Sequence, residues 1–248
     1  MIRVHKDLNR NNPNSLIDNN IIRIRELCIE NQRYDKRFNN RYKQTDTKES
    51  LKKIYNQKCA FCEQKITRCI DNNQQECSST VEHYRPKSIY YWLAFSWDNL
   101  LWCCHRCNQN KGNSFEINSS KIEYAELFKD NIHSSASFYQ STENPKLIHP
   151  ELESIRNKLT FIDGIIDSTD IRVKYTIDIC KLDRDDLNEK RLKVLEKFIM
   201  NARKRNRLNK SYEDILDNLK KDFMNEKSEF RALKYWILMN HKSLVEEN

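Results

Sequence analysis

Four cysteines of this chain stand in two Cys-x-x-Cys pairs, within the stretches CAFC and CHRC. The first pair is Cys59 and Cys62, and the second is Cys104 and Cys107. A Cys-x-x-Cys turn places two thiolates on one side of a tight loop, and two such turns supply the four sulfur ligands of a tetrahedral zinc site. The 41 residues between the pairs must hold folded structure. We therefore predict a structural zinc ion bound by these four cysteines.

Other uses of the cysteines explain less of the pattern. A redox-active Cys-x-x-Cys accounts for one pair and not for two. Cys103 is a weaker ligand than Cys104, because only Cys104 gives the two-residue gap to Cys107. His105 is a possible substitute, but it points away from the turn if both neighbouring cysteines bind. The remaining cysteines that we interpret as buried or free thiols are Cys28, Cys69, Cys77 and Cys180.

Polar side chains around the second pair supply another set of chemical groups. A zinc ion held by four thiolates has no open position, so any reaction must take place at these side chains. Glu82 and Asn108 carry the hard oxygen ligands that suit Mg²⁺ or Mn²⁺. The imidazole of His83 titrates near neutral pH and can take a proton from water, and Asn99 can orient the loop around it. The cations that can meet phosphate are Arg85, Lys87 and Lys111.

The order of these motifs resembles that of the zinc-stabilised HNH endonucleases. It runs as Cys-x-x-Cys, an acid followed by His-x-x-Pro, Asn-Leu, and Cys-x-x-Cys-Asn-x-x-Lys-Gly. The longer segments around these motifs are similar in sequence to the HNH nuclease subunits of Septu-type anti-phage systems, which also occur beside some retrons. That similarity covers roughly residues 50–200, in the segments KCAFCEQKI, VEHYRPKS, YYWLAFSWDNLLWCCHRCNQNKGNSFEI, LIHPELE and LTFIDGII.

The resemblance implies a ββα-metal fold, in which two strands and a helix hold one divalent ion. In that pattern Glu82 and Asn108 bind catalytic Mg²⁺ or Mn²⁺, His83 is the general base and Asn99 positions it. The implied protein is a DNA-cutting nuclease subunit that works with an ATPase partner of the ABC/SMC-like kind. One departure is that Glu82 stands where many HNH proteins have Asp. Glutamate is one methylene longer, so it can also reach the ion through a water molecule.

Two other functions stay open at this point. HNH sites can also cut RNA, so a host tRNA is an alternative substrate, and the sequence does not separate RNA from DNA. The other alternative is a zinc-bearing nucleic-acid-binding module without catalysis. Such a module needs the four cysteines but neither His83 nor Asn108, and the chain has both.

The net charge of +8 is concentrated near the N-terminus. Residues 1–58 hold 14 Lys and Arg against 7 Asp and Glu, whereas residues 59–118 hold six of each. Aromatic residues are interleaved with this surplus at Tyr34, Phe38, Tyr42 and Tyr55. We interpret the surplus as the solvated face of a helix, with attraction of phosphate as the alternative.

Apolar periodicity predicts a mainly α-helical protein around the small ββα core, an α+β arrangement. Expected N-caps are Asp46, Asp183 and Ser211, and Asp163-Gly164 predicts a two-residue hairpin turn. The segments STVEHYRP and YYWLAFSW are expected to form strands or tight loops. Helices are expected over 15–39, from about 46 toward the first cysteine pair, over 104–112, over 119–131 and over most of the chain from 169 onward.

These elements suggest three parts and a location. The parts are a basic helical segment over 1–58, an HNH module over 59–118, and a helical region over 119–248 with a short hairpin near 159–166. A membrane partner is not expected, because no run of about 18 apolar residues is present. The first ten residues lack the apolar stretch of a signal peptide, so we expect a reducing compartment, the cytoplasm.

Overall fold

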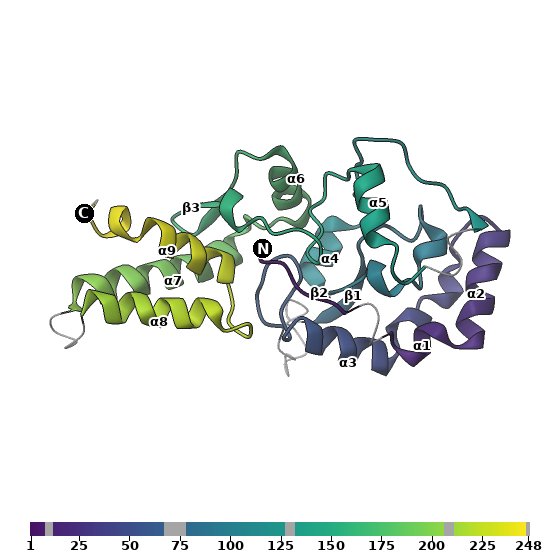
Figure 1. Ribbon diagram of the computed structural model, residues 1–248, viewed down its shortest axis with the longest axis horizontal. Helices are drawn as coiled ribbons and strands as arrows, with labels where there is room; N and C mark the ends of the chain where they lie inside the picture. The colour runs from purple at the N-terminus through teal and green to yellow at the C-terminus, as the bar shows by residue number, and fades with distance from the viewer. Residues whose placement is uncertain (8–11, 67–77, 127–131, 206–210, 247–248) are drawn as a thin grey trace.

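The computed structural model describes residues 1–7, 12–66, 78–126, 132–205 and 211–246 (Figure 1). The expectations for Cys69, Cys77 and residues 127–131 lie outside this part of the chain. The protein is mainly helical, with two small two-stranded sheets, as predicted. Helices α1 and α2 lie at one end of the molecule and α7 to α9 lie at the other, and between them the first sheet lies above α3 in this view (Figure 1).

The N-terminal end is built from short helices rather than from the single helix predicted over 15–39. Its elements are α1 (Asn14–Ile17), α2 (Asn19–Glu30), the 3-10 turns η1 (Lys36–Phe38) and η2 (Arg41–Lys43), and α3 (Thr45–Ile54). Asp18 causes the break, because it is extended and its carboxylate accepts a hydrogen bond from the backbone N of Ile21 at 2.9 Å. A side chain that caps the following helix ends the preceding one.

Asp46 caps a different helix from the predicted one. Helix α3 begins after Gln44 without a side-chain cap, and Asp46 lies in its first turn. The carboxylate of Asp46 accepts from the backbone N of Thr47 in α3 at 2.8 Å, and also from the backbone N of Ser15 at 2.9 Å and the Ser15 hydroxyl at 2.5 Å. The prediction that Asp46 is the N-cap residue of α3 was wrong, because Gln44 occupies that position and the Asp46 carboxylate is shared with Ser15, 31 residues away.

The centre of the molecule is an antiparallel pair of strands followed directly by a helix. Strand β1 (Ser79–His83) pairs with β2 (Leu100–Cys104), so that Glu82 lies opposite Leu101. Two 3-10 turns, η4 (Tyr91–Leu93) and η5 (Trp97–Asn99), occupy the connection between the strands. Helix α4 (His105–Lys111) follows β2 and ends at Gly112, whose φ is +50°. This is the ββα arrangement that the motif order predicts.

The segment after this centre differs from its prediction. Residues 119–126 were expected to be helical, but the chain runs beside the end of α5 (Ala136–Glu143) instead. The backbone N of Asn118 and that of Ser119 donate to the carbonyls of Asn144 and Glu143, both at 3.1 Å. The polar stretch is therefore held by backbone pairing with a distant segment, which a helical pattern does not reveal.

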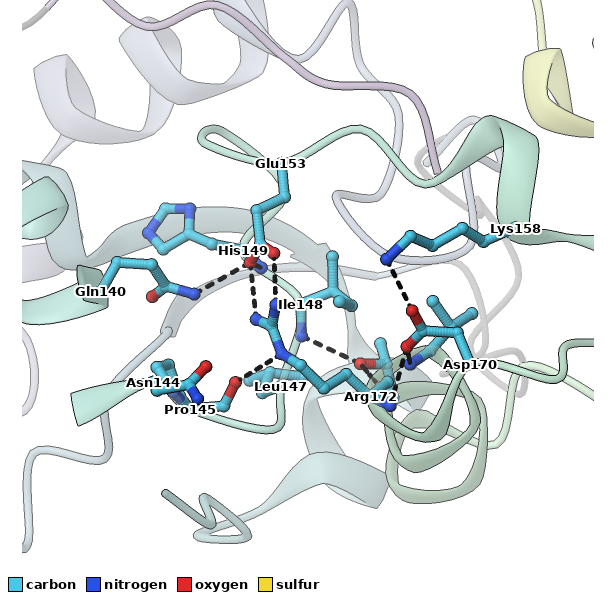
Figure 2. A network of polar contacts seen from close by, with 12 residues as sticks. Gln140, Asn144, Pro145, Leu147, Ile148, His149, Glu153, Lys158, Asp170 and Arg172 are labelled. Carbon is cyan, nitrogen blue, oxygen red and sulfur yellow. Dashed lines mark hydrogen bonds and ion pairs between the residues drawn. The ribbon is translucent and has the colours of Figure 1, made fainter. Parts of the chain in front are cut away.

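A network of polar contacts fastens residues 144–153 onto helix α6 (Ile171–Cys180) (Figure 2). Arg172 donates to both carboxylate oxygens of Glu153, at 2.7 and 2.9 Å, and its Nε donates to the carbonyl of Pro145 at 2.9 Å. The same Glu153 accepts from the side chain of Gln140 at 2.9 Å and from the backbone N of His149 at 3.0 Å. One carboxylate thus joins α5, this connecting segment and α6.

The predicted hairpin forms at Asp163-Gly164. Strands β3 (Thr160–Ile162) and β4 (Ile165–Asp167) pair antiparallel after the 3-10 turn η7 (Arg156–Lys158). Gly164 has φ of +82°, and a Cβ placed there would lie 2.7 Å from the backbone N of Leu192. The turn therefore packs directly against the backbone of helix α7 (Asp185–Arg203).

The C-terminal helices α7, α8 (Tyr212–Met224) and α9 (Arg231–Glu246) pack side by side (Figure 1). Ser211 caps α8 in a reciprocal capping box with Asp214, which confirms that prediction. Asp183 does not cap α7, because Arg184 occupies the N-cap position without a side-chain bond. Within the described residues, no helix has the length and apolar composition needed to cross a bilayer.

One hydrophobic core connects these parts. Its buried members come from the N-terminal helices, the central sheet and the C-terminal helices, and they include Leu51, Trp97 and Ile237. A smaller cluster around Trp92 packs against α2 and α5, and the Trp92 indole donates to the hydroxyl of Tyr139 in α5 at 2.7 Å. The central ββα unit is therefore enclosed by packing on several sides.

Candidate metal centres

The four predicted cysteines converge into one buried cluster, the four-cysteine cluster of Cys59, Cys62, Cys104 and Cys107. Their sulfur atoms all lie within 4.8 Å of one another, and all four residues are buried. The first pair is brought to the second because the backbone N of Ala60 donates to the carbonyl of Trp102 in β2 at 2.9 Å. The clustering that the spacing predicts is therefore confirmed.

The dimensions of the four-cysteine cluster fit a zinc ion. A tetrahedral site with metal–sulfur bonds of about 2.3 Å has sulfur–sulfur edges of about 3.8 Å. The sulfur atoms of Cys62 and Cys104 are 3.9 Å apart. Hydrogen bonds from neighbouring thiols, that of Cys103 foremost, lower the pKa of Cys104, whereas burial raises that of Cys59. Four thiolates in a tetrahedral array are a ligand set that suits a structural zinc ion.

Two residues beside the four-cysteine cluster affect it without being among the four. The Sγ atom of Cys103 lies 3.6 Å from that of Cys59 and is fully buried. The guanidinium of Arg184 donates to Cys107 Sγ at 3.5 Å, which places a positive charge next to the sulfur ligands. Sequence reasoning missed Arg184, because it is 77 residues from Cys107 and carries no motif.

His83 ends strand β1 and is 95% buried, with its ring held in one orientation. Its Nε2 lies 2.9 Å from the backbone carbonyl oxygen of Ala94. Because a carbonyl only accepts hydrogen bonds, Nε2 carries the hydrogen and Nδ1 keeps its lone pair. Burial, with the nearby charge of Lys87, lowers the pKa of His83 well below its usual value, so the ring is neutral at pH 7.

Asn99 fixes the loop that holds this imidazole. Its side-chain oxygen accepts from the backbone N of Arg85 at 2.8 Å, and its amide group donates to the carbonyls of Arg85 and Leu93, both at 3.1 Å. Leu93 directly precedes Ala94, whose carbonyl holds His83. The amide of Asn99 therefore joins both ends of the β1–β2 connection around the histidine.

Glu82 is buried and forms an ion pair with Lys111 of α4. The Lys111 ammonium lies 2.8 Å from Glu82 Oε1 and also donates to the carbonyl of His83 at 2.9 Å, and it has no exposed surface. Burial raises the pKa of Glu82, and the Lys111 charge opposes that shift. Lys111 is thus an internal counter-charge and has no surface on which to meet a nucleic acid.

Asn108 lies one turn before Lys111 and contacts the same strand. Its side-chain nitrogen donates to Thr80 Oγ1 at 3.1 Å. Thr80 and Glu82 are two residues apart in β1, so their side chains share one face of the sheet. Helix α4 therefore carries Asn108 and Lys111 over the strand face that carries Glu82.

The other two predicted phosphate contacts have different surroundings. Arg85 is buried in the core, where its Nε lies 2.8 Å from a carboxylate oxygen of Glu143. It is therefore not exposed to meet phosphate. Lys87 is half-buried, and its ammonium lies 3.2 Å from the hydroxyl of Tyr42. Tyr42 itself packs edge-on against His83, with 4.4 Å between the ring centres, a neighbour that the sequence did not indicate.

Part of this chain is similar in sequence to known proteins. No protein-family model matches it. Septu protein PtuB of Bacillus mycoides (strain KBAB4) is 32% identical over an alignment of 169 residues, which covers 62% of this chain and 52% of that protein. Septu protein PtuB of Bacillus thuringiensis is 25% identical over 137 residues, 55% of this chain and 41% of that protein. The chain thus spans about half the length of the curated relatives it matches. Over 62% of its own length, this chain is a homologue of Septu protein PtuB.

Proposed function

We propose that this chain is a metal-dependent HNH-type endonuclease that hydrolyses phosphodiester bonds in DNA. The observation that carries the proposal is the state of His83, a neutral imidazole whose Nε2 is tied to the Ala94 carbonyl. This leaves Nδ1 as the nitrogen with a free lone pair. An imidazole in this state is suited to take a proton from water.

The reaction proposed for the site is a hydrolysis with His83 as general base. Nδ1 takes one proton from a water molecule while the water oxygen attacks phosphorus. The bond from phosphorus to the 3′ oxygen then breaks, the 3′ oxygen keeps the electron pair and takes a proton from a solvent water, and the products are a 3′ hydroxyl and a 5′-phosphate. The imidazolium of His83 returns its proton to solvent. Asn99 contributes by holding the loop that fixes the ring orientation. Lys111 contributes by fixing Glu82 and the His83 backbone in one position.

The residues that would hold a catalytic divalent ion are Glu82 and Asn108. A carboxylate and an amide oxygen suit Mg²⁺ or Mn²⁺ in chemistry, and the strand face they share already accommodates a cation, the Lys111 ammonium. When bound, such an ion supplies charge stabilisation for the phosphoryl group and the leaving oxygen. Glu82 retains its second carboxylate oxygen for this purpose, since Lys111 contacts only Oε1.

We also propose that the chain is the nuclease subunit of an anti-phage defence complex in the cytoplasm. The support is its similarity to Septu protein PtuB. The motif resemblance further suggests an ATPase partner of the ABC/SMC-like kind. Copurification of the chain with an ATPase encoded beside it tests this part separately, and its failure leaves the nuclease proposal intact.

The nuclease proposal is tested with purified wild type, His83→Ala and Asn108→Ala. Each is incubated with supercoiled plasmid or total tRNA in Mg²⁺, Mn²⁺ or EDTA. We expect cleavage only with a divalent ion, and a loss of about 10²-fold or more in His83→Ala, as for removal of a general base. His241→Ala is the matched control, because His241 lies on α9, away from the ββα unit. If His83→Ala and Asn108→Ala cut nucleic acid as fast as wild type, the proposed catalytic site is wrong.

The same experiment separates the two alternatives. Cleavage of tRNA but not of plasmid favours an RNA substrate at the same site. Binding of either polymer without cleavage, unchanged in His83→Ala, favours a zinc-dependent binding module. The fixed tautomer of His83 supports the nuclease over the module, because binding alone does not need it.

A further inference from the structure

Two lysines from distant parts of the sequence lie on the same tyrosine ring. Lys43 belongs to η2 in the basic N-terminal segment, and its ammonium is 5.4 Å from the ring centre of Tyr42. Lys87 follows β1, and its ammonium is 5.2 Å from the same ring centre and 3.2 Å from the tyrosine hydroxyl. Lys87 also lies 5.3 Å from the ring of Tyr34. We call Lys43 and Lys87 the lysine pair.

The lysine pair lies next to the candidate general base. Tyr42, which both ammonium groups contact, packs edge-on against His83 with 4.4 Å between ring centres. Lys87 is four residues after His83 in the sequence. Both lysine charges act on the imidazole and lower its pKa, which places them within electrostatic range of the ring. An anion held by the lysine pair is therefore an anion beside His83.

The lysine pair lacks the acidic partner that several lysines and arginines in the interior have. Lys6, Arg85 and Lys111 each pair with a carboxylate at 2.8 Å. In the part of the chain that the structure describes, neither Lys43 nor Lys87 forms an ion pair, although both are half-buried. Glu82, the carboxylate within electrostatic range of both, is already bound to Lys111.

Holding two like charges together costs free energy that an anion between them would recover. The pKa of Lys87 is lowered first by burial and next by the charge of Lys43, so the two ammonium groups repel each other. Burial likewise lowers the pKa of Lys43, with Lys48 as a further nearby cation. A partly desolvated ammonium group without an ion-pair partner therefore gains free energy when it forms a charge-assisted hydrogen bond to phosphate.

We propose that Lys43 and Lys87, which both lie close to the Tyr42 ring, bind backbone phosphates of the nucleic acid beside the bond that is hydrolysed at His83. The inference rests on the proposed nuclease function and extends it to a residue of the N-terminal segment. Lysine ammonium groups act as point charges toward phosphate, so the contact is to the phosphodiester backbone and carries no base preference. For Lys43, a role in substrate binding replaces the interpretation of the N-terminal surplus as a solvated helix face.

The test measures binding without cleavage. Fluorescence anisotropy with a labelled 20-base-pair DNA duplex, and separately with a single-stranded RNA of equal length, is recorded over a series of NaCl concentrations in buffer without added Mg²⁺ or Mn²⁺ and without chelator, so that the zinc stays bound. The variants are Lys43→Gln, Lys87→Gln and the double variant. The matched control is Lys190→Gln with Lys193→Gln, which removes the same charge from exposed positions on α7.

For duplex DNA, we expect the double variant to bind about tenfold more weakly than wild type in 100 mM NaCl. The slope of log K against log salt should fall by about 1.8, because each lost phosphate contact removes about 0.9. For RNA the expected decrease is about 1.4, since a single strand gives about 0.7 per contact. Restoring the charge with Lys43→Arg and Lys87→Arg should recover most of the affinity. The α7 control should keep the wild-type slope.

The possible failures are distinguishable. If wild type cleaves nucleic acid while the double glutamine variant binds with the same affinity and slope as the α7 control, the lysine pair has no role and the nuclease proposal stands. If wild type neither binds nor cleaves either polymer, both proposals fall. Zinc content and far-UV circular dichroism of each variant establish that a loss of binding is not a loss of fold.

Discussion

Lys111 and Glu82 form a fully enclosed ion pair across the contact between α4 and β1, with 2.8 Å between Nζ and Oε1. The same ammonium donates to the backbone carbonyl of His83 at 2.9 Å. One side chain of the helix therefore holds the strand at two consecutive residues. Both of these residues belong to the proposed catalytic site, so its geometry depends on a charge that has no contact with solvent.

We predict that Lys111→Met destabilises the protein strongly. It leaves the Glu82 carboxylate buried without its counter-charge, and breaking a buried pair on one side costs about 3–5 kcal/mol. Urea unfolding followed by circular dichroism at pH 7 measures this loss. Adding Glu82→Gln should recover most of the stability, because the double variant has no buried charge left. A single variant within about 1 kcal/mol of wild type would show that the pair is not buried in solution.

Zinc content should distinguish the two adjacent cysteines of β2. Cys104→Ser is expected to lose the bound zinc, because Cys104 is one of four sulfur atoms within 4.8 Å of one another. Cys103→Ser is expected to retain one zinc per chain, although Cys103 lies 3.6 Å from Cys59. Elemental analysis of the purified variants measures the zinc content. If Cys103→Ser loses zinc and Cys104→Ser keeps it, the fourth ligand is Cys103 and not Cys104. Chelation of the zinc in wild type should also lower the melting temperature.

Asn99→Ala is expected to loosen the loop around His83. The change leaves one backbone N–H and two carbonyls without the amide that satisfies them, at a cost of about 2–4 kcal/mol. Nitrogen chemical shifts of His83 should indicate an Nε2–H tautomer in wild type and a mixture in the variant. Asn31→Ala, which removes a single exposed bond to the carbonyl of Leu27, serves as the control. A His83 that keeps its tautomer in Asn99→Ala would remove the positioning role of Asn99.

His149 makes stability depend on pH in a predictable direction. Burial lowers the pKa of His149 well below its usual value, and its Nδ1 accepts a hydrogen bond from the backbone N of Glu151 at 3.2 Å. Below about pH 6.5 the unfolded chain takes up a proton at this residue and the folded protein does not, so stability is lost as the pH falls. Burial lowers the pKa of His133 to about 4, so it adds to the loss between pH 6.5 and 4.

The variant His149→Gln isolates this effect from that of the buried carboxylates, whose raised pKa values act in the opposite direction. We expect wild type to be more stable than His149→Gln at pH 7.5, and the difference in unfolding free energy to shrink as the pH is lowered to 5. Urea titrations at four pH values measure it. A difference that stays constant with pH would mean that His149 titrates alike in the folded and unfolded chain.

Features that depend on neighbouring residues were predictable from the sequence. The spacing of each cysteine pair, the Asp163-Gly164 turn and the Ser211 cap are all local patterns, and the structure has each of them. The order of motifs along the chain also predicted the ββα arrangement, because strand, strand and helix follow one another without insertion of another α-helix or strand.

Features that depend on distant contacts were not predictable. Asp46 caps a helix that begins near Ser15, and the expected cap at Asp183 is absent. Lys111 and Arg85 were expected to face phosphate, and nothing in their local sequence indicates the buried carboxylates that the fold brings to them. Tyr42 contacts His83 from 41 positions away in the chain. Such partners are chosen by tertiary packing, which a single sequence does not display.

The chain contains only two glycines, and one of them sets the distance between the hairpin and α7. At Gly164 even a methyl group would press into the backbone of Leu192. Saturation mutagenesis of this codon, followed by selection for folded protein, should therefore return glycine alone, whereas the neighbouring exposed Ile165 should accept many residues. Over evolution, we therefore expect position 164, where the β3–β4 turn meets α7, to remain glycine.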